Sequence, residues 1–187
     1  MSRIGIDVDG VLRDFPQDLM RVVKENYPQY INENSDKLLH WNLSDNFNCT
    51  KEDLQQIYWH DYADVIMGNG TPIYGAIKRM YDLFDWAEEN GHTVCCITSQ
   101  KPHARYHTLH WLGKYGLNFD TVYFRKGFEK WKVNVDYLVD DSPNNFKYWV
   151  KGRGTQEGFI LVDALYNQEI NSSYRVYNLD QVKNIIK

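Results

Sequence analysis

Five short apolar segments alternate with helical patterns along the chain, and this alternation constrains the fold more than any other feature. Each segment has four to six residues, many of them β-branched or aromatic, as buried parallel strands do. Alternating strands and helices predict an α/β fold, a three-layer sandwich around a mainly parallel, Rossmann-like sheet. The segments cover residues 3–7, 93–98, 120–124, 136–139 and 159–162.

Three segments between these strands have the features of helices. Residues 75–90 place apolar side chains on one face and are followed by Gly91, which is typical of a helix end. Residues 103–115 also have a helical pattern. Ser142 and Pro143 suit the start of a helix that continues to about residue 150.

Residues 15 to about 70 interrupt the alternation, because they contain helical patterns but no clear strand. The turn-forming residues at 69–72 would return the chain to the sheet. We therefore expect a single domain, residues 1–187, in which residues 16–71 form a small helical cap subdomain inserted after the first strand.

Charge and composition exclude several classes of protein. The chain has 21 Lys and Arg against 25 Asp and Glu, a net charge of −4, which argues against a protein that coats DNA without sequence preference. Its longest apolar runs have four to five residues, whereas a membrane-spanning helix needs about 20. The charged start has no long apolar stretch behind it, so no signal peptide is expected.

The cysteines indicate a reducing compartment. The chain has an odd number of cysteines, Cys49, Cys95 and Cys96, and they form no C-x-x-C motif. Neighbours on a strand point to opposite faces, so Cys95 and Cys96 are poor disulfide partners. We expect small buried thiols in a cytoplasmic protein.

Four carboxylates lie at or just past the ends of predicted strands: Asp7, Asp9, Asp140 and Asp141. Ligands of open α/β sheets bind at the carboxyl ends of the strands, so the four side chains would share one crevice. Such a cluster needs protonation or a divalent cation, and hard oxygen ligands favour Mg²⁺. In the alternative reading, each Asp only caps a turn or a helix.

The segment that begins at Asp7 has the residues needed for phosphoryl transfer. Asp7 ends a strand, so its side chain is held rigidly and can act as a nucleophile. Asp9 follows two residues later and can transfer a proton at the same bound group. Gly10 allows the backbone to turn sharply beside a ligand.

Other polar residues could bind the phosphate itself. Thr98 and Ser99 end the second predicted strand, where hydroxyls and backbone amides can hold phosphate oxygens, although they could instead cap the next helix. Among four cations between residues 125 and 132, we expect Lys130 to reach the carboxylates and the others to be solvated. His103, His107 and His110 share a helical spacing that could suggest a metal site, but a solvated face is favoured.

These segments together resemble the four motifs of the haloacid dehalogenase superfamily of phosphatases, in the same order. The closest resemblance is to the 5′(3′)-deoxyribonucleotidase family, and it covers roughly residues 3–150, where the insertion matches only in size and position. Arg13 and the stretch 99–101 depart from that family, in which a small residue and a proline would be expected. The segments that carry the resemblance are DVDGVLRDF at 7–15, PIYGA at 72–76, ITS at 97–99, Lys130 and YLVDD at 137–141.

The resemblance implies a mechanism for the carboxylates. Asp7 would attack phosphorus and form an aspartyl-phosphate, and Asp9 would protonate the leaving oxygen and then activate water. Mg²⁺ would be held by Asp7, by the backbone carbonyl of Asp9 and by one of Asp140 and Asp141. Lys130 would bind the phosphoryl oxygens.

The resemblance also implies how substrate is bound. Thr98, together with Ser99, would bind phosphoryl oxygens beside Lys130. Phe15 would stack on the base, and the insertion would form a helical cap over the site. Trp41 is our choice for a second aromatic there; its alternative is a core residue of the cap.

The predicted function is that of a Mg²⁺-dependent phosphomonoesterase, a 5′(3′)-(deoxy)ribonucleotidase acting on nucleoside monophosphates. One alternative is a phosphatase acting on nucleic-acid ends, although nucleic acid is not the expected partner of an acidic chain. Another is a non-catalytic module that binds Mg²⁺ or a phosphorylated ligand, but the intact Asp7, Asp9, Lys130 and Asp140 argue for catalysis. The expected partners are a small phosphomonoester and a second copy of the chain in a homodimer.

Overall fold

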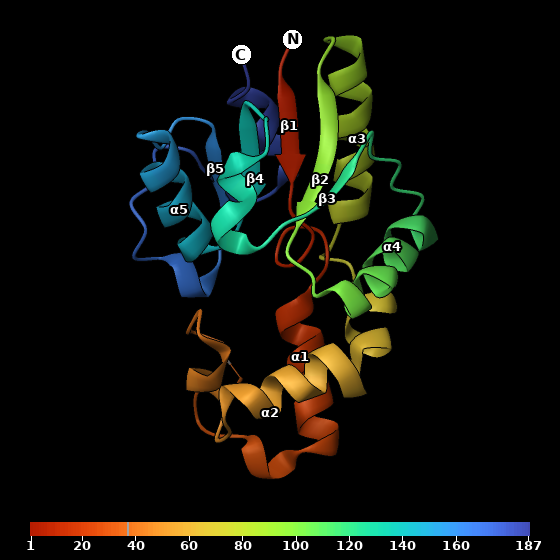
Figure 1. The fold of residues 1–187 in the computed structure, drawn as a ribbon, viewed down its shortest axis with the longest axis vertical. Helices are drawn as coiled ribbons and strands as arrows, with labels where there is room; N and C mark the ends of the chain where they lie inside the picture. The colour runs from red at the N-terminus through yellow and green to blue at the C-terminus, as the bar shows by residue number, and fades with distance from the viewer. Residues whose placement is uncertain (37) are drawn as a thin grey trace.

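Six parallel strands form the centre of the protein in the computed structural model, which describes residues 1–36 and 38–187. Their order is β3-β2-β1-β4-β5-β6, and every neighbouring pair is parallel. Figure 1 shows β1 in the middle, with both chain termini at the end of the sheet opposite the helices α1 and α2. The strands are β1 (Arg3–Ile6), β2 (Thr93–Thr98), β3 (Val122–Phe124), β4 (Tyr137–Asp140), β5 (Phe159–Val162) and β6 (Arg175–Val176).

Both faces of the sheet are buried, and β2 shows how the sequence achieves this. Val94 and Cys96 pack into one apolar cluster, whereas Cys95 and Ile97 pack into another on the opposite face. This alternation confirms that the two adjacent cysteines point apart, and all three cysteines are free thiols. Burial on both faces explains why the strand is a continuous apolar run.

Helices cover the two faces and complete the predicted three layers (Figure 1). On one face, α3 (Ala76–Glu89), α4 (Arg105–Lys114) and the 3-10 helix η8 (Leu179–Asn184) contribute residues to the first cluster. On the other face, α5 (Pro143–Arg153) and η6 (Gly127–Lys132) cover the second cluster. The predicted start of α5 is confirmed, because the Ser142 side chain accepts a hydrogen bond from Asn145 N at 3.1 Å.

The helices between β1 and α3 pack around an apolar cluster of their own, beyond the carboxyl ends of the strands (Figure 1). We call these residues, 15–70, the cap segment. The first helix begins at Phe15 because Asp14 caps it and Pro16 suits its first turn. The described elements are α1 (Phe15–Asn26), η1 (Pro28–Tyr30), η2 (Leu43–Asn46), α2 (Lys51–Gln56) and two π-helical turns, η3 (Ile57–Asp61) and η4 (Asp64–Gly68).

The two connections between the cap segment and the sheet run side by side. Asp14 N donates to Thr71 O at 2.8 Å, and Ile73 N donates to Leu12 O at 2.8 Å. The buried Asp18 carboxylate accepts hydrogen bonds from the backbone and hydroxyl of Thr71, at 2.6 and 3.0 Å. The entry and the exit of the cap segment are thus joined to each other.

The structure differs from the sequence-based expectation in two elements. The sheet has a sixth strand, β6, whose two residues have only one apolar side chain, Val176, and so form no recognisable apolar run. The helix expected at 103–115 begins at Arg105, because residues 102–104 form a 3-10 turn (η5, Pro102–Ala104).

Among the described residues, every helix is too short or too polar to span a lipid bilayer.

Candidate active site

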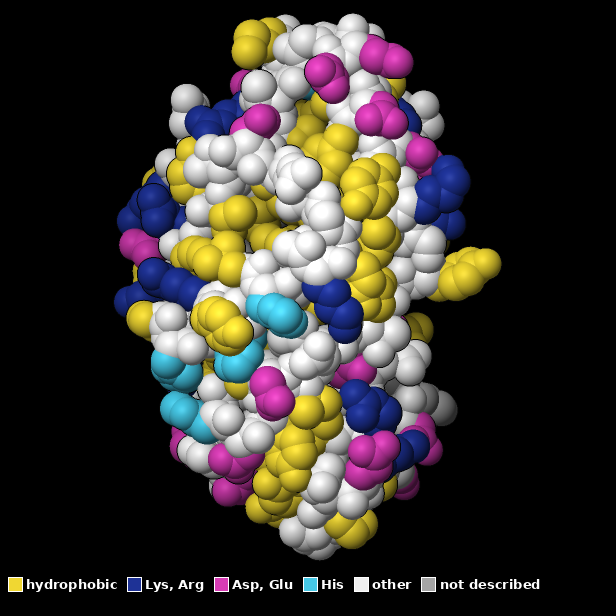
Figure 2. Space-filling view, turned by 90° about the vertical axis from the view of Figure 1, so that its right-hand side faces the viewer, with side chains coloured by type: hydrophobic (Ala, Val, Ile, Leu, Met, Phe, Trp, Pro, Cys, Tyr) yellow, Lys and Arg dark blue, Asp and Glu magenta, His cyan; other side chains and the backbone are white. Residues whose placement is uncertain are grey.

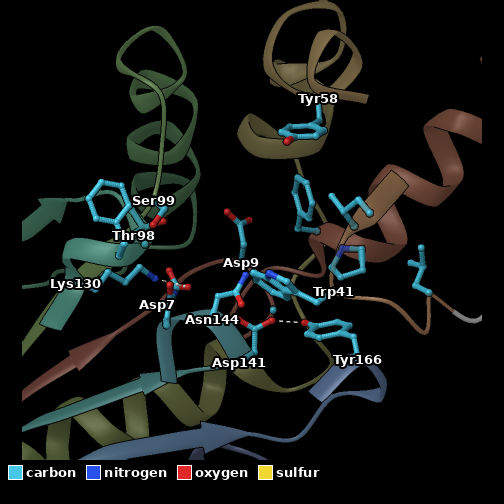
Figure 3. A pocket seen from close by; sticks show the side chains of 18 of the residues that line it. Asp7, Asp9, Trp41, Tyr58, Thr98, Ser99, Lys130, Asp141, Asn144 and Tyr166 are labelled. Carbon is cyan, nitrogen blue, oxygen red and sulfur yellow. Dashed lines mark hydrogen bonds and ion pairs between the residues drawn. The ribbon is translucent and has the colours of Figure 1, made fainter. Parts of the chain in front are cut away.

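A pocket of about 420 Å³ lies where the carboxyl ends of β1, β2 and β4 face the cap segment. Figure 3 shows its side chains converging from the sheet and from the cap segment. Predicted site residues that line it are Asp7, Asp9, Phe15, Trp41, Thr98, Ser99, Lys130 and Asp141. The remaining one, Asp140, lies just beneath the pocket and has no exposed surface.

Lys130 and Asp7 form a buried ion pair at the base of the pocket (Figure 3). Lys130 Nζ lies 2.6 Å from Asp7 Oδ2 and 2.7 Å from Asp140 Oδ2, and its side chain is 1% exposed. Burial alone would lower the pKa of the Lys130 ammonium, but the attraction of Asp140 and Asp7 outweighs it and raises that pKa. The lysine therefore stays charged beside the carboxylate that is the predicted nucleophile.

The two adjacent carboxylates after β4 have different surroundings. Asp140 is saturated by protein donors: Lys130 Nζ, Ser142 N at 2.9 Å and Asn145 Nδ2 at 2.9 Å. Asp141 faces the pocket and accepts a hydrogen bond from the Tyr166 hydroxyl. Of the pair, Asp141 is therefore the one available to a ligand.

Asp7, Asp140 and Asp141 form a buried carboxylate cluster, with one oxygen of each lying within 4.8 Å of the others. Burial, more than the neighbouring carboxylates, raises the pKa of Asp7 to about 7 although Lys130 opposes the rise. Burial and then the charges of Asp140 and Asp7 raise the pKa of Asp141 well above its usual range. Hard oxygen ligands crowded in this way fit a small divalent cation such as Mg²⁺.

Gly10 brings the backbone of the loop close to this cluster. Its φ of 77° lies in the left-handed region, which favours glycine. A Cβ at this position would overlap Asp141 Oδ2. A glycine is therefore required here by both conformation and space, as the sequence indicated.

Asp9 belongs to a different network from Asp7. Figure 3 shows its carboxylate directed toward the side of the pocket where Tyr58 lies. Arg13 Nε donates to Asp9 Oδ1 at 2.8 Å, and Gln100 Nε2 donates to Asp9 Oδ2 at 2.8 Å. Arg13 and Gln100 occupy the positions that depart from the related family, and both contact this one side chain.

Arg13 itself is completely buried. Its guanidinium donates to the Met67 carbonyl and to Thr108 Oγ1 at 3.3 Å, and it lies 5.4 Å from the ring of Trp111. Trp111 in turn donates to the Gly70 carbonyl at 2.7 Å. Arg13 thus connects Asp9 to the end of the cap segment and to α4.

The hydroxyl groups at the end of β2 have unused hydrogen-bonding capacity. Among the described residues, Thr98 Oγ1 and Ser99 Oγ have no hydrogen-bond partner although both atoms are buried. Both residues line the pocket beside Lys130 (Figure 3). Buried hydroxyls without a partner are costly, so a bound phosphate that accepts from them would remove an unfavourable contribution.

Aromatic side chains form the outer part of the pocket. Phe15 meets Tyr58 edge to face, with ring centroids 5.5 Å apart. Trp41 is 39% exposed and lies 5.5 Å from the ring of Tyr166, so it lines the pocket and is not a core residue. These rings leave an apolar space above the polar base of the pocket.

The pocket also contains residues that sequence reasoning did not identify, among them Tyr58, Tyr166 and Asn145. A signal for Asn145 exists, since it lies in the first turn of the helix that follows Asp140 and Asp141. Nothing in the local sequence marks Tyr58 or Tyr166, which reach the pocket from the cap segment and from the loop after β5.

The histidines singled out by their spacing lie outside this pocket. Figure 2 shows histidine side chains gathered on one face of the molecule. His103 stacks on His60 at 4.6 Å, and Tyr106 packs against His107 and His110. In the part of the chain that the structure describes, the carboxylate cluster is the only group of three or more side chains with metal-ligating geometry.

The sequence family described as "5' nucleotidase, deoxy (Pyrimidine), cytosolic type C protein" matches residues 1–187. The chain belongs to this family. It is therefore a nucleotidase of the haloacid dehalogenase type, which confirms the resemblance read from the sequence. The match extends past residue 150, where the recognised resemblance ended.

Individual relatives of this nucleotidase agree with the family match. A Chlorobaculum tepidum protein whose assigned name is 5′(3′)-deoxyribonucleotidase is 28% identical over 160 residues, covering 81% of this chain and 74% of that protein. CbbY from Rhodobacter sphaeroides, solved in complex with phosphate, has a TM-score of 0.60 at 14% identity, covering 97% of this chain and 96% of its own. The hydrolase YfnB from Bacillus subtilis, solved with magnesium, has a TM-score of 0.60 at 14% identity, covering 98% and 97%. The two structures show that the nucleotidase has the haloacid dehalogenase fold.

Proposed function

We propose that this nucleotidase is a Mg²⁺-dependent 5′(3′)-(deoxy)ribonucleotidase that releases phosphate from nucleoside monophosphates through an aspartyl-phosphate. One observation carries the proposal: a carboxylate at the end of β1 is paired with a buried lysine, beside unpartnered hydroxyls, at the base of an aromatic pocket. Cationic, hydroxyl and carboxylate groups at one point suit phosphoryl transfer, and the aromatic upper part suits a nucleobase.

In the first step, an oxygen of Asp7 attacks phosphorus, so that the Asp7–phosphorus bond forms as the bond to the ester oxygen breaks. Val8 N donates to Asp7 Oδ1 at 2.8 Å and Lys130 binds Oδ2, so the carboxylate has a fixed orientation. Thr98 and Ser99 donate to the phosphoryl oxygens. Lys130 balances the negative charge that these oxygens bring next to Asp7.

Asp9 moves the protons in both steps. It gives a proton to the leaving alkoxide, and it then takes one from the water that attacks the phosphoenzyme, so inorganic phosphate is released and Asp7 is regenerated. Arg13 and Gln100 hold this carboxylate at the edge of the pocket.

The carboxylate cluster supports the metal part of the proposal. Asp7 and Asp141 would hold Mg²⁺ with the backbone carbonyl of Asp9, while Asp140 keeps Lys130 and Asn145 in place. When bound, the ion would supply positive charge that lowers the repulsion between phosphate and Asp7. In this proposal residues 16–71 act as a cap subdomain that covers the substrate.

The proposed site of action is the cytoplasm. Two observations support it: the family is described as a cytosolic type, and Cys49, Cys95 and Cys96 are free thiols.

The deciding experiment is a phosphate-release screen over ribo- and deoxyribonucleoside 5′- and 3′-monophosphates and over sugar phosphates. Each substrate is tested with Mg²⁺ and with excess chelator, and the Asp7→Asn variant is the control for contaminating phosphatases. We expect release from nucleotides only with Mg²⁺ and only from the unaltered protein. Faster turnover of sugar phosphates than of nucleotides would show that sugar phosphates are the substrate class. No release from any phosphomonoester would make the protein a binding module.

A further inference from the structure

A second pocket adjoins the candidate active site. It has a volume of about 1000 Å³ and lies between the cap segment and the loops that follow β2 and β3. Four residues line both pockets: Tyr58, Trp59, Ser99 and Gly127. The second pocket therefore adjoins the first at these four residues, next to the space above Asp7.

Positive charge is concentrated in this second pocket, although the whole chain has a net charge of −4. Six cationic side chains line it, against one acidic side chain, Glu129. They come from three separate parts of the chain, at 51, 101–105 and 125–132, so the fold brings them together. The cations are Lys51, Lys101, Arg105, Arg125, Lys126 and Lys132.

Few of these charges are neutralised by the protein itself. Of the six, only Lys132 pairs with a carboxylate among the described residues, at 3.3 Å from Glu129. Lys101 donates to the neutral side chain of Gln55 at 3.3 Å. Arg105 has a buried Nε without a hydrogen-bond partner in the described part of the chain. Such groups keep their capacity to bind an anion.

Aromatic rings hold several of the cations in place. Arg105 lies 5.1 Å from the ring of Phe124, and Lys101 lies 5.9 Å from the ring of Trp59. Contacts of this kind orient a cation while leaving its charge available. The second pocket is therefore lined by solvent-accessible cations, of which Arg105 and Lys101 are oriented by ring contacts.

We propose that the second pocket binds a further phosphate group of the substrate, so that the preferred substrate is a nucleotide with at least one phosphate besides the one removed. A nucleoside 3′,5′-bisphosphate is the simplest example. This inference rests on the proposed function, because it places the scissile phosphate at Asp7. The reaction stays hydrolysis of one ester bond: one phosphate leaves Asp7 as inorganic phosphate, and the other remains esterified in the second pocket.

The dimensions of the pocket favour a small ligand over a nucleic-acid strand. A volume of about 1000 Å³ is at the upper end of the range for small-molecule pockets. A nucleic-acid strand would in addition need an open groove through which it could leave the pocket. Lys51, the first residue of α2, lines the pocket on the cap side. The negative charge of the rest of the chain would repel a long polyanion.

The test compares kcat/KM for a nucleoside 3′,5′-bisphosphate with that for the matching monophosphate, and the ratio is the measured quantity. The variant Lys101→Gln/Lys126→Gln removes two charges of the pocket, and Lys147→Gln/Lys151→Gln removes two exposed charges of α5 as a matched control. We expect the ratio to exceed one and to fall about fivefold to tenfold in the first variant, since each exposed charge pair contributes modestly. In the control variant the ratio of the two kcat/KM values should stay unchanged. Added salt should lower this ratio in the unaltered protein.

Binding is measured separately from turnover by calorimetric titration of the Asp7→Asn variant with both nucleotides. Tighter binding of the bisphosphate, lost in the combined variant with Lys101→Gln/Lys126→Gln, supports the proposal. Good turnover of the monophosphate with an equal ratio in all variants overturns the second phosphate site but keeps the nucleotidase. If no nucleotide is hydrolysed, the proposed function fails, and the titration still decides the anion site.

A third substrate distinguishes a strand from a small ligand. It is a 5′-phosphorylated oligonucleotide of about ten residues, measured under the same conditions. Preference for the bisphosphate over the oligonucleotide supports the proposal. A kcat/KM for the oligonucleotide above that for the bisphosphate, reduced by Lys101→Gln/Lys126→Gln, would overturn it and make the pocket a nucleic-acid groove.

Discussion

Arg13 Nη2 lies 2.7 Å from Asp9 Oδ1, so a guanidinium with no exposed surface is paired with a carboxylate that is 26% exposed at the edge of the pocket. The pair is reinforced by Gln100, which donates to the other oxygen of Asp9. An interior arginine with a single carboxylate partner fixes that partner strongly, because separating them would leave a buried charge alone. The orientation of Asp9 is therefore set by residues beneath the pocket as well as by its own loop.

Arg13→Met should lower kcat through Asp9. We expect a loss of about tenfold to a hundredfold on alkyl phosphates, below the full effect of general acid–base catalysis, and a smaller loss on p-nitrophenyl phosphate. A double-mutant cycle with Asp9→Asn separates this from structural damage: Arg13→Met should cost little further activity once Asp9 is replaced. Additive losses would show that Arg13 does not act through Asp9.

The variants Asp7→Asn and Asp9→Asn should differ in whether the phosphoenzyme can form. Asp7→Asn removes the nucleophile, so no phosphoenzyme forms and activity falls by several orders of magnitude. Asp9→Asn should lose roughly 10²–10⁴-fold on substrates with poor leaving groups and less on p-nitrophenyl phosphate, whose leaving group needs little protonation. Rapid-quench labelling with a radiolabelled phosphomonoester measures the intermediate. Radiolabel bound to the Asp7→Asn protein would show that another residue is the nucleophile.

Lys130→Met should destabilise the metal-free protein. It leaves Asp7 and Asp140 buried together without their shared cation, a change that costs about 3–5 kcal/mol for buried pairs. Thermal unfolding should therefore occur roughly 10 °C lower. Lys132→Met, two residues away on an exposed side chain, is the matched control and should shift unfolding by less than about 2 °C. Equal shifts for both variants would contradict the assigned role of the ion pair.

Mg²⁺ should raise the unfolding temperature, and Asp141 should be needed for this effect. A cation at a concentration of about 100 times its Kd adds about 2.7 kcal/mol of stability. Asp141→Asn should abolish the increase, whereas Asp85→Asn, on the exposed side of α3, should keep it. Calorimetry with Mg²⁺ and with chelator gives the comparison. An undiminished increase in Asp141→Asn would remove this side chain from the metal site.

Trp41→Ala should weaken nucleotide binding with little effect on a small phosphate. A ring that stacks on a base contributes about 1–3 kcal/mol, so KM for a nucleotide should rise roughly fivefold to more than a hundredfold, with p-nitrophenyl phosphate nearly unchanged. Phe15→Ala should show the same selectivity with some loss of stability, because Phe15 also packs on Tyr58. Tyr74→Ala is the control, since its ring is 93% exposed and lies outside the pocket. Equal losses on both substrates would indicate structural damage.

The polar base of the pocket was predictable from sequence for a physical reason. Asp7, Thr98 and Asp140 each end an apolar strand, and parallel strands bring their carboxyl ends to one edge of the sheet. Lys130 was the one of four cations expected to reach the carboxylates, and the structure places it between Asp7 and Asp140.

The network around Asp9 was not predictable, because it depends on contacts between distant parts of the chain. Arg13 and Gln100 were noticed only as departures from a family pattern, and their shared partner is set by tertiary packing. Tyr166 reaches Asp141 from a loop 25 residues further along the chain, at a position without local signal. Strand β6 was missed because pairing with β5 determines it more than its own two residues do.

The cap segment leaves and rejoins the sheet at adjacent points, where Asp14 and Thr71 are hydrogen-bonded to each other. A short turn between these two residues would close the core without moving any strand. The whole segment could therefore be replaced by another without disturbing the core, because insertions are best tolerated where the two ends of a segment lie together. Evolution can therefore exchange the part that selects the leaving group while the carboxylates that break the ester bond stay untouched.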